Sequence, residues 1–337
     1  MLESQKSHLF SDEIINREIQ KTIDGYVTQN SSSSLTKVTQ YHFSSGGKKL
    51  RAKIAYLIAI EFKCSHENAI LWASICEVLH NASLIHDDLQ DQDSYRRNQL
   101  SLWKKFDSHT AITAGDFLIF LSMQMVYDLK VNESIKLKLM QLVTSTSIEL
   151  ANGQYNEKFL KLHSVEGLWD MYLQMVDQKT SALFELPLVG AGVLAVSSES
   201  RLKELETLAT DFGQLFQVQD DIIDLYGVKG RKQQGNDIKE GKLSALCATH
   251  VLLHPGDHQM MIDILNTHRD QTNHETIYKL KEIFKHQGSL SKCLDFIQQK
   301  LNDIENNELL TTNTKLSAYF QNIVNKLMQN FNEVHYE

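Results

Sequence analysis

The sequence predicts an all-α protein built from long helices. Only two prolines occur in 337 residues, and proline is the residue that most strongly interrupts a helix. Apolar residues recur at helical spacing along most of the chain, whereas no segment shows the strict alternation of a half-buried strand. No linker separates the helical segments. We therefore expect a single domain that spans residues 1–337 and encloses its most apolar helices.

Helix boundaries are clearest near the N-terminus. A first helix is expected from about Ser11, because Asp12 and Glu13 place negative charge in its first turn, as the helix dipole favours. A glycine pair at residues 46–47 permits a turn before the next apolar run. Ser65 is a typical N-cap residue and is expected to begin a helix that continues to residue 90 or so.

Two later segments are unusually apolar. Residues 110–129 are apolar nearly all round, so this helix is expected at the centre of the protein. Residues 182–196 contain Pro187 and fit a buried, kinked helix better than a membrane span. Ser198 and Glu199 are expected to open the long helix that follows.

Composition excludes several classes of protein. The net charge of −8 argues against a general nucleic-acid binder. The N-terminus lacks the basic start and apolar run of a signal peptide, and no stretch reaches about 18 apolar residues. The cysteines form no CxxC motif, so we expect reduced thiols and a cytoplasmic protein; they are Cys64, Cys76, Cys247 and Cys293.

Two acidic triplets carry the strongest functional signal. Asp87, Asp88 and Asp91 follow an apolar helical run, and residues 220, 221 and 224 repeat the same spacing. Positions three or four apart share a helix face, so each triplet gathers three carboxylates at one helix end. Such clusters need a counter-charge, and hard divalent cations with oxygen ligands are the natural one. Two facing triplets would hold a diphosphate through Mg²⁺.

Five motifs in order resemble those of the trans-isoprenyl diphosphate synthases, in particular the longer-chain members. The stretch GGKKLR at residues 46–51 resembles GGKxLR, and residues 87–97 match DDxxDxxxxRR. Lys179-Thr180 resembles the KT motif, residues 216–224 match FQxxDDxxD, and residues 235–242 match GNDxxEGK. The resemblance implies an all-α, single-domain bundle of long helices around a central cavity, the isoprenoid synthase type, and a homodimer.

The resemblance also implies a role for each matching residue. Six aspartates would hold Mg²⁺, three ions in all, bridging to an allylic diphosphate: Asp87, Asp88, Asp91, Asp220, Asp221 and Asp224. Direct contact with that diphosphate is implied for Arg96, Lys179 and Lys232. Binding of isopentenyl diphosphate is implied for Lys48, Arg51, His80 and Arg97. Thr180 and Gln217, with Phe216 of the same motif, would lie beside the reacting carbons, and Lys242 would add charge as its loop closes.

Some positions depart from the family pattern. Asn98 stands where glycine usually follows the two arginines, and Ala52 replaces a common proline. Arg231 stands where glycine is typical, so Lys229 competes with Lys232 for the role of loop lysine. Each basic residue also has a plainer interpretation, such as a surface ion pair worth under about 1 kcal/mol.

The length of the product is predicted from the residues before the first triplet. In the family, a bulky aromatic residue four or five positions before Asp87 closes the cavity for short products. This chain has Ala82 and Ser83 there, so we expect a prenyl diphosphate of twenty carbons or longer.

Three alternatives stay open at the level of sequence. A farnesyl or geranyl diphosphate synthase would make a shorter product. A class I terpene cyclase would use the same metal chemistry without isopentenyl diphosphate, and a non-catalytic regulatory subunit would usually lack part of a triplet, whereas both are complete here.

Overall fold

The computed structural model of the chain describes residues 12–161, 164–227 and 234–332. Helices make up 81% of it, which confirms the all-α prediction. The chain forms two compact units. Unit 1 comprises Met1–Ile148 and Leu183–Glu206, and unit 2 comprises Glu149–Ala182 and Thr207–Glu337.

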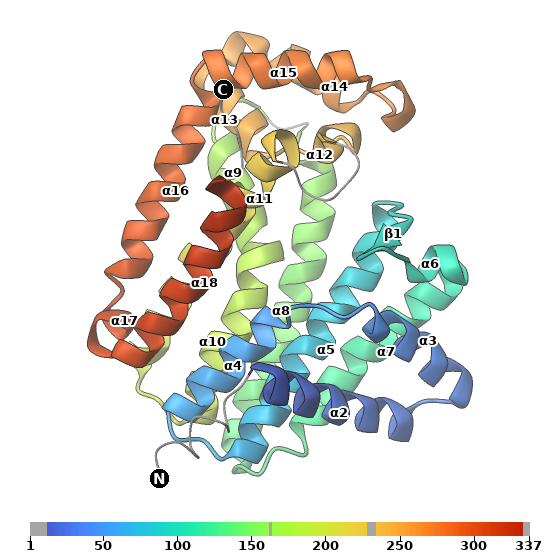
Figure 1. Cartoon of the computed structure of the whole chain (residues 1–337), viewed down its shortest axis with the longest axis vertical. Coiled ribbons are helices and arrows are strands. Elements are labelled where there is room, and N and C mark those ends of the chain that lie inside the picture. Colours follow the sequence, from blue (N-terminus) through green and yellow to red (C-terminus); the bar gives the residue numbers. More distant parts are fainter. Residues whose placement is uncertain (1–11, 162–163, 228–233, 333–337) are drawn as a thin grey trace. The chain divides into compact units, whose positions relative to one another are not determined.

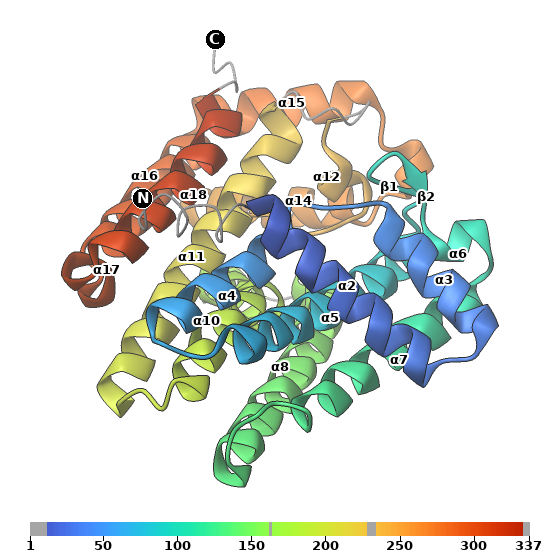
Figure 2. The same ribbon diagram turned by 60° about the horizontal axis from the view of Figure 1, so that its bottom comes forward.

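Unit 1 is organised around helix α5, against which α2, α4 and α7 pack; Figures 1 and 2 show these helices together. Its elements are α2 (Asp12–Asn30), α3 (Ser33–Ser44), α4 (Leu50–Glu61), α5 (His66–Gln90), β1 (Tyr95–Arg96), β2 (Gln99–Leu100), α6 (Leu102–Lys105) and α7 (Ser108–Val126), with parts of α8 (Glu133–Leu160), α10 (Ala182–Leu194) and α11 (Glu199–Tyr226).

Helix α5 begins as predicted. The Ser65 hydroxyl accepts a hydrogen bond from the backbone N–H of Asn68 at 3.3 Å, which caps the helix. The fully buried Trp72 ring then lies against α10, and a side chain at Gly190 would overlap that ring. Pro187 lies inside α10 between buried leucines, so the apolar segment is a buried helix of unit 1 as expected.

Helix α7 differs from its prediction. It was expected to be central, but Ile112 and Phe120 are exposed on one side, while Ala111, Ala114 and Leu118 are buried on the other. A helix that is apolar nearly all round does not show from its sequence which of its faces the rest of the chain covers.

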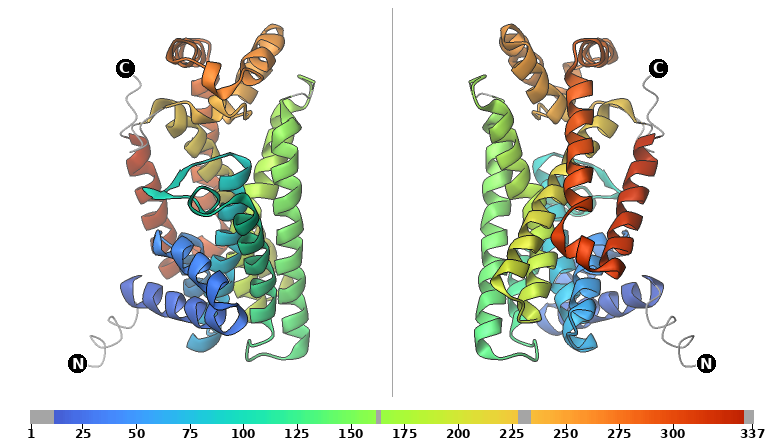
Figure 3. Two further views of the ribbon diagram at one scale, coloured as in Figure 1. Left: turned by 90° about the vertical axis from the view of Figure 1, so that its right-hand side faces the viewer. Right: turned by 90° about the vertical axis from the view of Figure 1, so that its left-hand side faces the viewer.

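Unit 2 contains the end of α8, most of α11 and the C-terminal helices. Helices α16 and α18 lie side by side and are joined by α17 (Figure 3). The elements of unit 2 that follow α8 are α9 (Leu168–Val176), the π-helical turn η2 (Asp177–Ser181), α12 (Asn236–Lys239), α13 (Ala245–Leu253), η3 (Pro255–Asp257), α14 (His258–Leu265), η4 (Arg269–Gln271), α15 (His274–His286), α16 (Ser289–Glu305), α17 (Glu308–Thr312) and α18 (Thr314–Asn332).

Candidate active site

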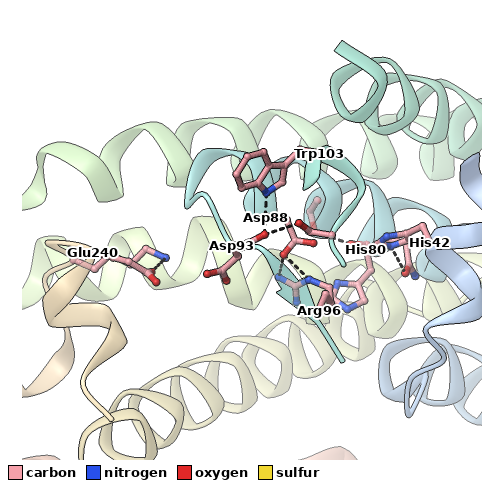
Figure 4. Close-up of polar contacts among 11 residues, drawn as sticks. His42, His80, Asp88, Asp93, Arg96, Trp103 and Glu240 are labelled. Carbon is pink, nitrogen blue, oxygen red and sulfur yellow. Dashed lines mark hydrogen bonds and ion pairs between the residues drawn. The ribbon is translucent and has the colours of Figure 1, made fainter. Parts of the chain in front are cut away.

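The first acidic triplet lies at the C-terminal end of α5, as predicted. Asp87 and Asp88 are in its last turn, and Asp91 is the C-cap residue. The Asp88 side chain is buried. Its Oδ1 accepts a hydrogen bond from Arg96 Nε at 2.7 Å and forms an ion pair with Nη2 at 2.5 Å (Figure 4). Burial raises the pKa of Asp88 to about 6, although the Arg96 guanidinium opposes that rise. Arg96 is therefore the counter-charge of Asp88.

Arg96 is held by a short hairpin that the sequence did not reveal. Strands β1 and β2 pair antiparallel, with Arg96 opposite Gln99. Arg97 and Asn98 form the two-residue turn, with φ angles of 51° and 65°. Such turns need positive φ at both positions, which asparagine tolerates better than most residues. Asn98 therefore suits the position that glycine usually fills.

The two ends of the hairpin are joined through one backbone carbonyl. The Asp93 carbonyl oxygen accepts hydrogen bonds from Ser101 Oγ at 2.5 Å and from Trp103 Nε1 at 2.8 Å (Figure 4). The anchoring keeps the arginine-bearing strand beside the end of α5.

Arg97 points to a different place from Arg96. A side chain at Gly47 would come within 2.7 Å of the Arg97 guanidinium carbon, so that group lies directly against the glycine. Gly47 has a φ of 149°, which only glycine adopts readily. The GGKKLR loop thus uses glycine both for its turn and for the close approach of the arginine.

Arg51 and His80 belong to the same basic region of unit 1. The Arg51 guanidinium stacks over the Phe184 ring, with its carbon 4.5 Å from the ring centre. Burial, and then the positive charges of Arg51 and Arg97, lower the pKa of His80 well below its ordinary value. His80 is therefore neutral at pH 7.

Three of the predicted substrate-binding residues differ in how far they are exposed. Lys48 is exposed in the loop before α4. Ala82 is fully buried on α5, and Ser83 is half-buried with its hydroxyl donating to the His80 carbonyl at 2.7 Å. Ala52 lies in the first turn of α4, where a backbone N–H has no helical partner, so the missing proline costs little.

The second acidic triplet lies near the end of α11, in unit 2. Asp221 is buried and accepts three hydrogen bonds, from Tyr172 Oη at 2.7 Å, the Ala245 N–H at 2.7 Å and Gln217 Nε2 at 2.8 Å. Burial raises the pKa of Asp221 to about 6, against these donors. The three donors fix the orientation of this carboxylate.

The KT motif is linked to this triplet by hydrogen bonds. Lys179 and Thr180 lie in the π-helical turn η2 between α9 and α10. The Thr180 hydroxyl donates to Gln217 Oε1 at 2.8 Å, and Gln217 in turn donates to Asp221. Lys179 Nζ pairs with Glu157 of α8 at 2.8 Å. The predicted residues Lys179, Thr180 and Gln217 thus converge within unit 2, with Phe216 beside Gln217 half-buried on α11.

The loop after α11 is described in part. Lys229, Arg231 and Lys232 lie outside the described residues, so the competition between the two lysines stays a prediction. Lys242 is half-buried and pairs with Glu240 at 3.1 Å.

Sequence reasoning missed four acidic or phenolic residues that complete these groups. Glu77, one turn before His80, is buried and lies 3.8 Å from Lys49 Nζ. Glu157, four residues after Gly153, holds Lys179. Spacing along a predicted helix could have suggested both. The other two residues are Asp237, which stands in a motif that was recognised, and Tyr172, which gave no signal in the sequence.

The other two missed residues, Asp237 and Tyr172, lie at the second acidic triplet. The Asp237 N–H donates to Asp224 Oδ2 at 3.2 Å, and burial together with the charges of Asp224 and Asp221 raises the pKa of Asp237 well above its ordinary range. Asp237 stands in the GND motif, which was matched without a role for its carboxylate. Tyr172 gives no sequence signal, because its contact with Asp221 spans 49 positions.

The donor atoms at both triplets suit magnesium. Carboxylate oxygens are the ligands that Mg²⁺ prefers, and Asp88 Oδ2 is buried with no hydrogen-bond partner in the part of the chain that the structure describes. A buried carboxylate oxygen that lacks a donor can accept a hard cation. Across the described ranges, no three acidic, histidine or cysteine side chains form a ready-made metal site.

Among the described helices, none is long and apolar enough to cross a membrane.

Comparison with known proteins identifies the family. The polyprenyl synthetase family model matches residues 32–284. An all-trans-nonaprenyl-diphosphate synthase (geranyl-diphosphate specific) from Rhodobacter capsulatus is 32% identical over 228 residues, which are 65% of this chain and 67% of that protein. A short chain isoprenyl diphosphate synthase from Methanocaldococcus jannaschii is 28% identical over 233 residues, 68% of this chain and 70% of that protein.

Solved structures agree on the fold. A geranylgeranyl pyrophosphate synthase superimposes with a TM-score of 0.79 at 24% identity, covering 88% of this chain and 92% of that one. This likeness confirms the predicted isoprenoid synthase fold. The two curated relatives named above are prenyl diphosphate synthases, which are trans-prenyltransferases, and this chain belongs to the polyprenyl synthetase family.

Proposed function

We propose that the protein condenses isopentenyl diphosphate with an allylic diphosphate to give an all-trans prenyl diphosphate of twenty carbons or longer. One observation carries this proposal beyond family membership. The neighbouring residues Arg96 and Arg97 are directed to different places, one to the Asp88 carboxylate and the other to the Gly47 loop. Two separate cationic positions suit a reaction that binds two diphosphates.

The allylic diphosphate is assigned to the acidic triplets and their cations. The family is magnesium-dependent in general, and we propose three Mg²⁺ ions. Bound Mg²⁺ supplies the positive charge that makes diphosphate a good leaving group. The proposed ligands are Asp87, Asp88, Asp91, Asp220, Asp221 and Asp224.

The chain's own residues then act on the leaving group and on the carbons. Lys179 and Arg96, with Lys232, would donate hydrogen bonds to the departing diphosphate, where negative charge develops as the C–O bond breaks. Thr180 and Gln217 would lie beside the allylic cation, oriented by the hydrogen bonds that run to Asp221. Buried apolar helices would keep water from quenching that cation.

Isopentenyl diphosphate is assigned to the basic region of unit 1. Arg51 and Arg97 would bind its diphosphate as fixed cations, and Lys48 would reach it from the exposed loop. His80, being neutral, would donate one N–H. Lys242 would add positive charge when its loop closes. After the double bond attacks the cation, a proton is lost, and the released diphosphate would accept it.

The test is incubation of the purified protein with Mg²⁺, isopentenyl diphosphate and a series of allylic primers, followed by chromatography of the products. We expect consumption of isopentenyl diphosphate and a product of at least twenty carbons. Products of ten or fifteen carbons alone would refute the proposed length. Conversion of the allylic primer without isopentenyl diphosphate would indicate a terpene cyclase, and no turnover would indicate a non-catalytic subunit.

We also propose a homodimer in which the exposed side of α7 is covered. Phe120 on α7 is 68% exposed and Leu137 on α8 is 70% exposed, with Ile112, Tyr127 and Ile148 also exposed. Apolar side chains in such numbers favour an interface. Light scattering behind a sizing column would measure the mass, and a monomer at micromolar concentration would refute this.

Two further proposals concern the chain as a whole. We propose that residues 1–337 act as one isoprenoid synthase domain, because α8, α10 and α11 each run from one unit into the other. We propose a cytoplasmic location because all four cysteines are free thiols.

A further inference from the structure

The π-helical turn η2 is the local structure that presents Lys179 and Thr180. The N–H of Ala182 donates to the Asp177 carbonyl, five residues back, which is the hydrogen bond of a π-helix. Such turns insert one residue into a helix and are weaker than the α-helix around them. A turn of this kind persists only where its surroundings hold it.

Two glycines let neighbouring helices approach the turn closely. A side chain at Gly153 of α8 would come within 2.9 Å of the Lys179 backbone nitrogen. On α11, a side chain at Gly213 would come within 2.5 Å of Ser181 Cα. The turn is therefore in direct backbone contact with two helices of unit 2.

Polar side chains join the turn to α11. Asp177 Oδ1 accepts hydrogen bonds from Ser181 Oγ at 2.9 Å and from Gln214 Nε2 at 2.9 Å, and Gln214 Nε2 also lies 3.1 Å from Oδ2. The first of these bonds connects the two ends of the turn, and the second connects it to α11. One turn before Gln214, the buried Asp211 pairs with Lys300 of α16 at 2.7 Å.

We propose that Asp177 is a positioning residue, which clamps η2 through Ser181 and Gln214 and so fixes Lys179 and Thr180 against the allylic diphosphate. Asp177 does not itself contact substrate. The inference rests on the proposed function, because it assigns those two residues to the allylic substrate. It predicts a change in kcat and in the KM for the allylic diphosphate but not in the KM for isopentenyl diphosphate, since the residues assigned to isopentenyl diphosphate belong to unit 1.

The experiment compares the wild type with Asp177→Ala, Asp177→Asn and a control, Asp170→Ala, which removes an exposed carboxylate from the neighbouring helix α9. Steady-state rates give kcat and the KM for each substrate, urea denaturation gives stability, and hydrogen exchange reports the amides of residues 177–182. A shift of the reacting groups by about 1 Å can lower the rate a hundredfold.

We expect Asp177→Ala to lower kcat/KM for the allylic diphosphate by roughly tenfold to a hundredfold, with the KM for isopentenyl diphosphate changed by less than about twofold. Exchange at η2 should quicken. Asp177→Asn should restore part of the activity, because its amide oxygen still accepts the two hydrogen bonds made to Oδ1, whereas its Nδ2 cannot accept the third from Gln214 Nε2. Asp170→Ala should match the wild type.

A double mutant tests the clamp itself. Because Gln214→Ala removes the same contact from the other side, the double variant with Asp177→Ala should be little worse than either single variant. Additive losses would overturn the proposal, as would an allylic kcat/KM that Asp177→Ala leaves unchanged. An equal rise in the KM for both substrates, with lowered stability, would also overturn it, because that result indicates a merely structural residue.

The two proposals fail in different ways. If the wild type shows no turnover with either substrate, the proposed function fails. Hydrogen exchange at η2 still decides whether Asp177 holds the turn, because it needs no substrate, and unchanged exchange in Asp177→Ala would overturn the clamp.

Discussion

Replacing Gly213 by alanine should destabilise the protein, although alanine favours helices. In an exposed helix interior the change would stabilise by about 1 kcal/mol. At position 213 the new methyl group would lie 2.5 Å from Ser181 Cα, whereas ordinary contacts begin near 3.4 Å. The two backbones must separate by about 1 Å, and overpacking of this kind costs about 1–3 kcal/mol. We expect a net loss of up to about 2 kcal/mol.

The matched control is Gly25→Ala in α2, where nothing lies within 4 Å of the added methyl group. That variant should gain up to about 1 kcal/mol. Urea denaturation followed by circular dichroism would measure both, and the two variants should shift in opposite directions. Because Ser181 belongs to η2, Gly213→Ala should also lower prenyltransferase activity. A Gly213→Ala protein as stable as Gly25→Ala would refute the reasoning.

Three other predictions follow from single contacts. Burial lowers the pKa of His42 from 6.5 to about 4. Between these pH values the unfolded chain binds a proton that the folded chain does not, so the free energy of unfolding should fall by about 3 kcal/mol as the pH drops from 6.5 to 4. His42→Gln should remove this loss in urea titrations at several pH values. Arg96→Met leaves the buried Asp88 carboxylate without its cation and should cost roughly 3 kcal/mol where Asp88 is ionised. Arg96 opposes the rise of the Asp88 pKa to about 6, so its loss raises that pKa further, and the variant takes up a proton at a higher pH than the wild type. The loss of stability should therefore shrink as the pH falls toward 6, and a loss that does not change with pH would contradict this. Ala82→Phe should shorten the product, and an unchanged chain length by chromatography would rule out this position as the floor.

Local chemistry made much of the fold predictable. Ser65 as a cap, the acidic first turn at Asp12 and the buried helix around Pro187 all follow from short-range rules, and the structure bears them out. The hairpin of residues 95–100 was missed because strands of two residues are too short to show alternation. The exposed side of α7 was missed because the sequence of an apolar helix does not tell whether its own chain covers every face.

The site was predictable where its residues stand in motifs. Asp88 and Asp221 were predicted by the spacing of the triplets, and Lys179 and Thr180 by resemblance to the KT motif, but their partners are distant in sequence. Tyr172 meets Asp221 only through tertiary packing, and no periodicity along the chain reports such a contact. That both triplets serve one metal cluster stays a prediction.

The hairpin limits which mutations residues 95–100 can accept while both arginines keep their contacts. Asparagine can stand for glycine at its tip, so substitution there is tolerated. Insertion or deletion is another matter, because a shift of one residue turns every side chain of a strand to the opposite face. One residue inserted between positions 96 and 99 would turn the Arg96 guanidinium away from Asp88 or the Arg97 guanidinium away from Gly47. Variation at this tip should therefore be confined to exchanges that preserve its length.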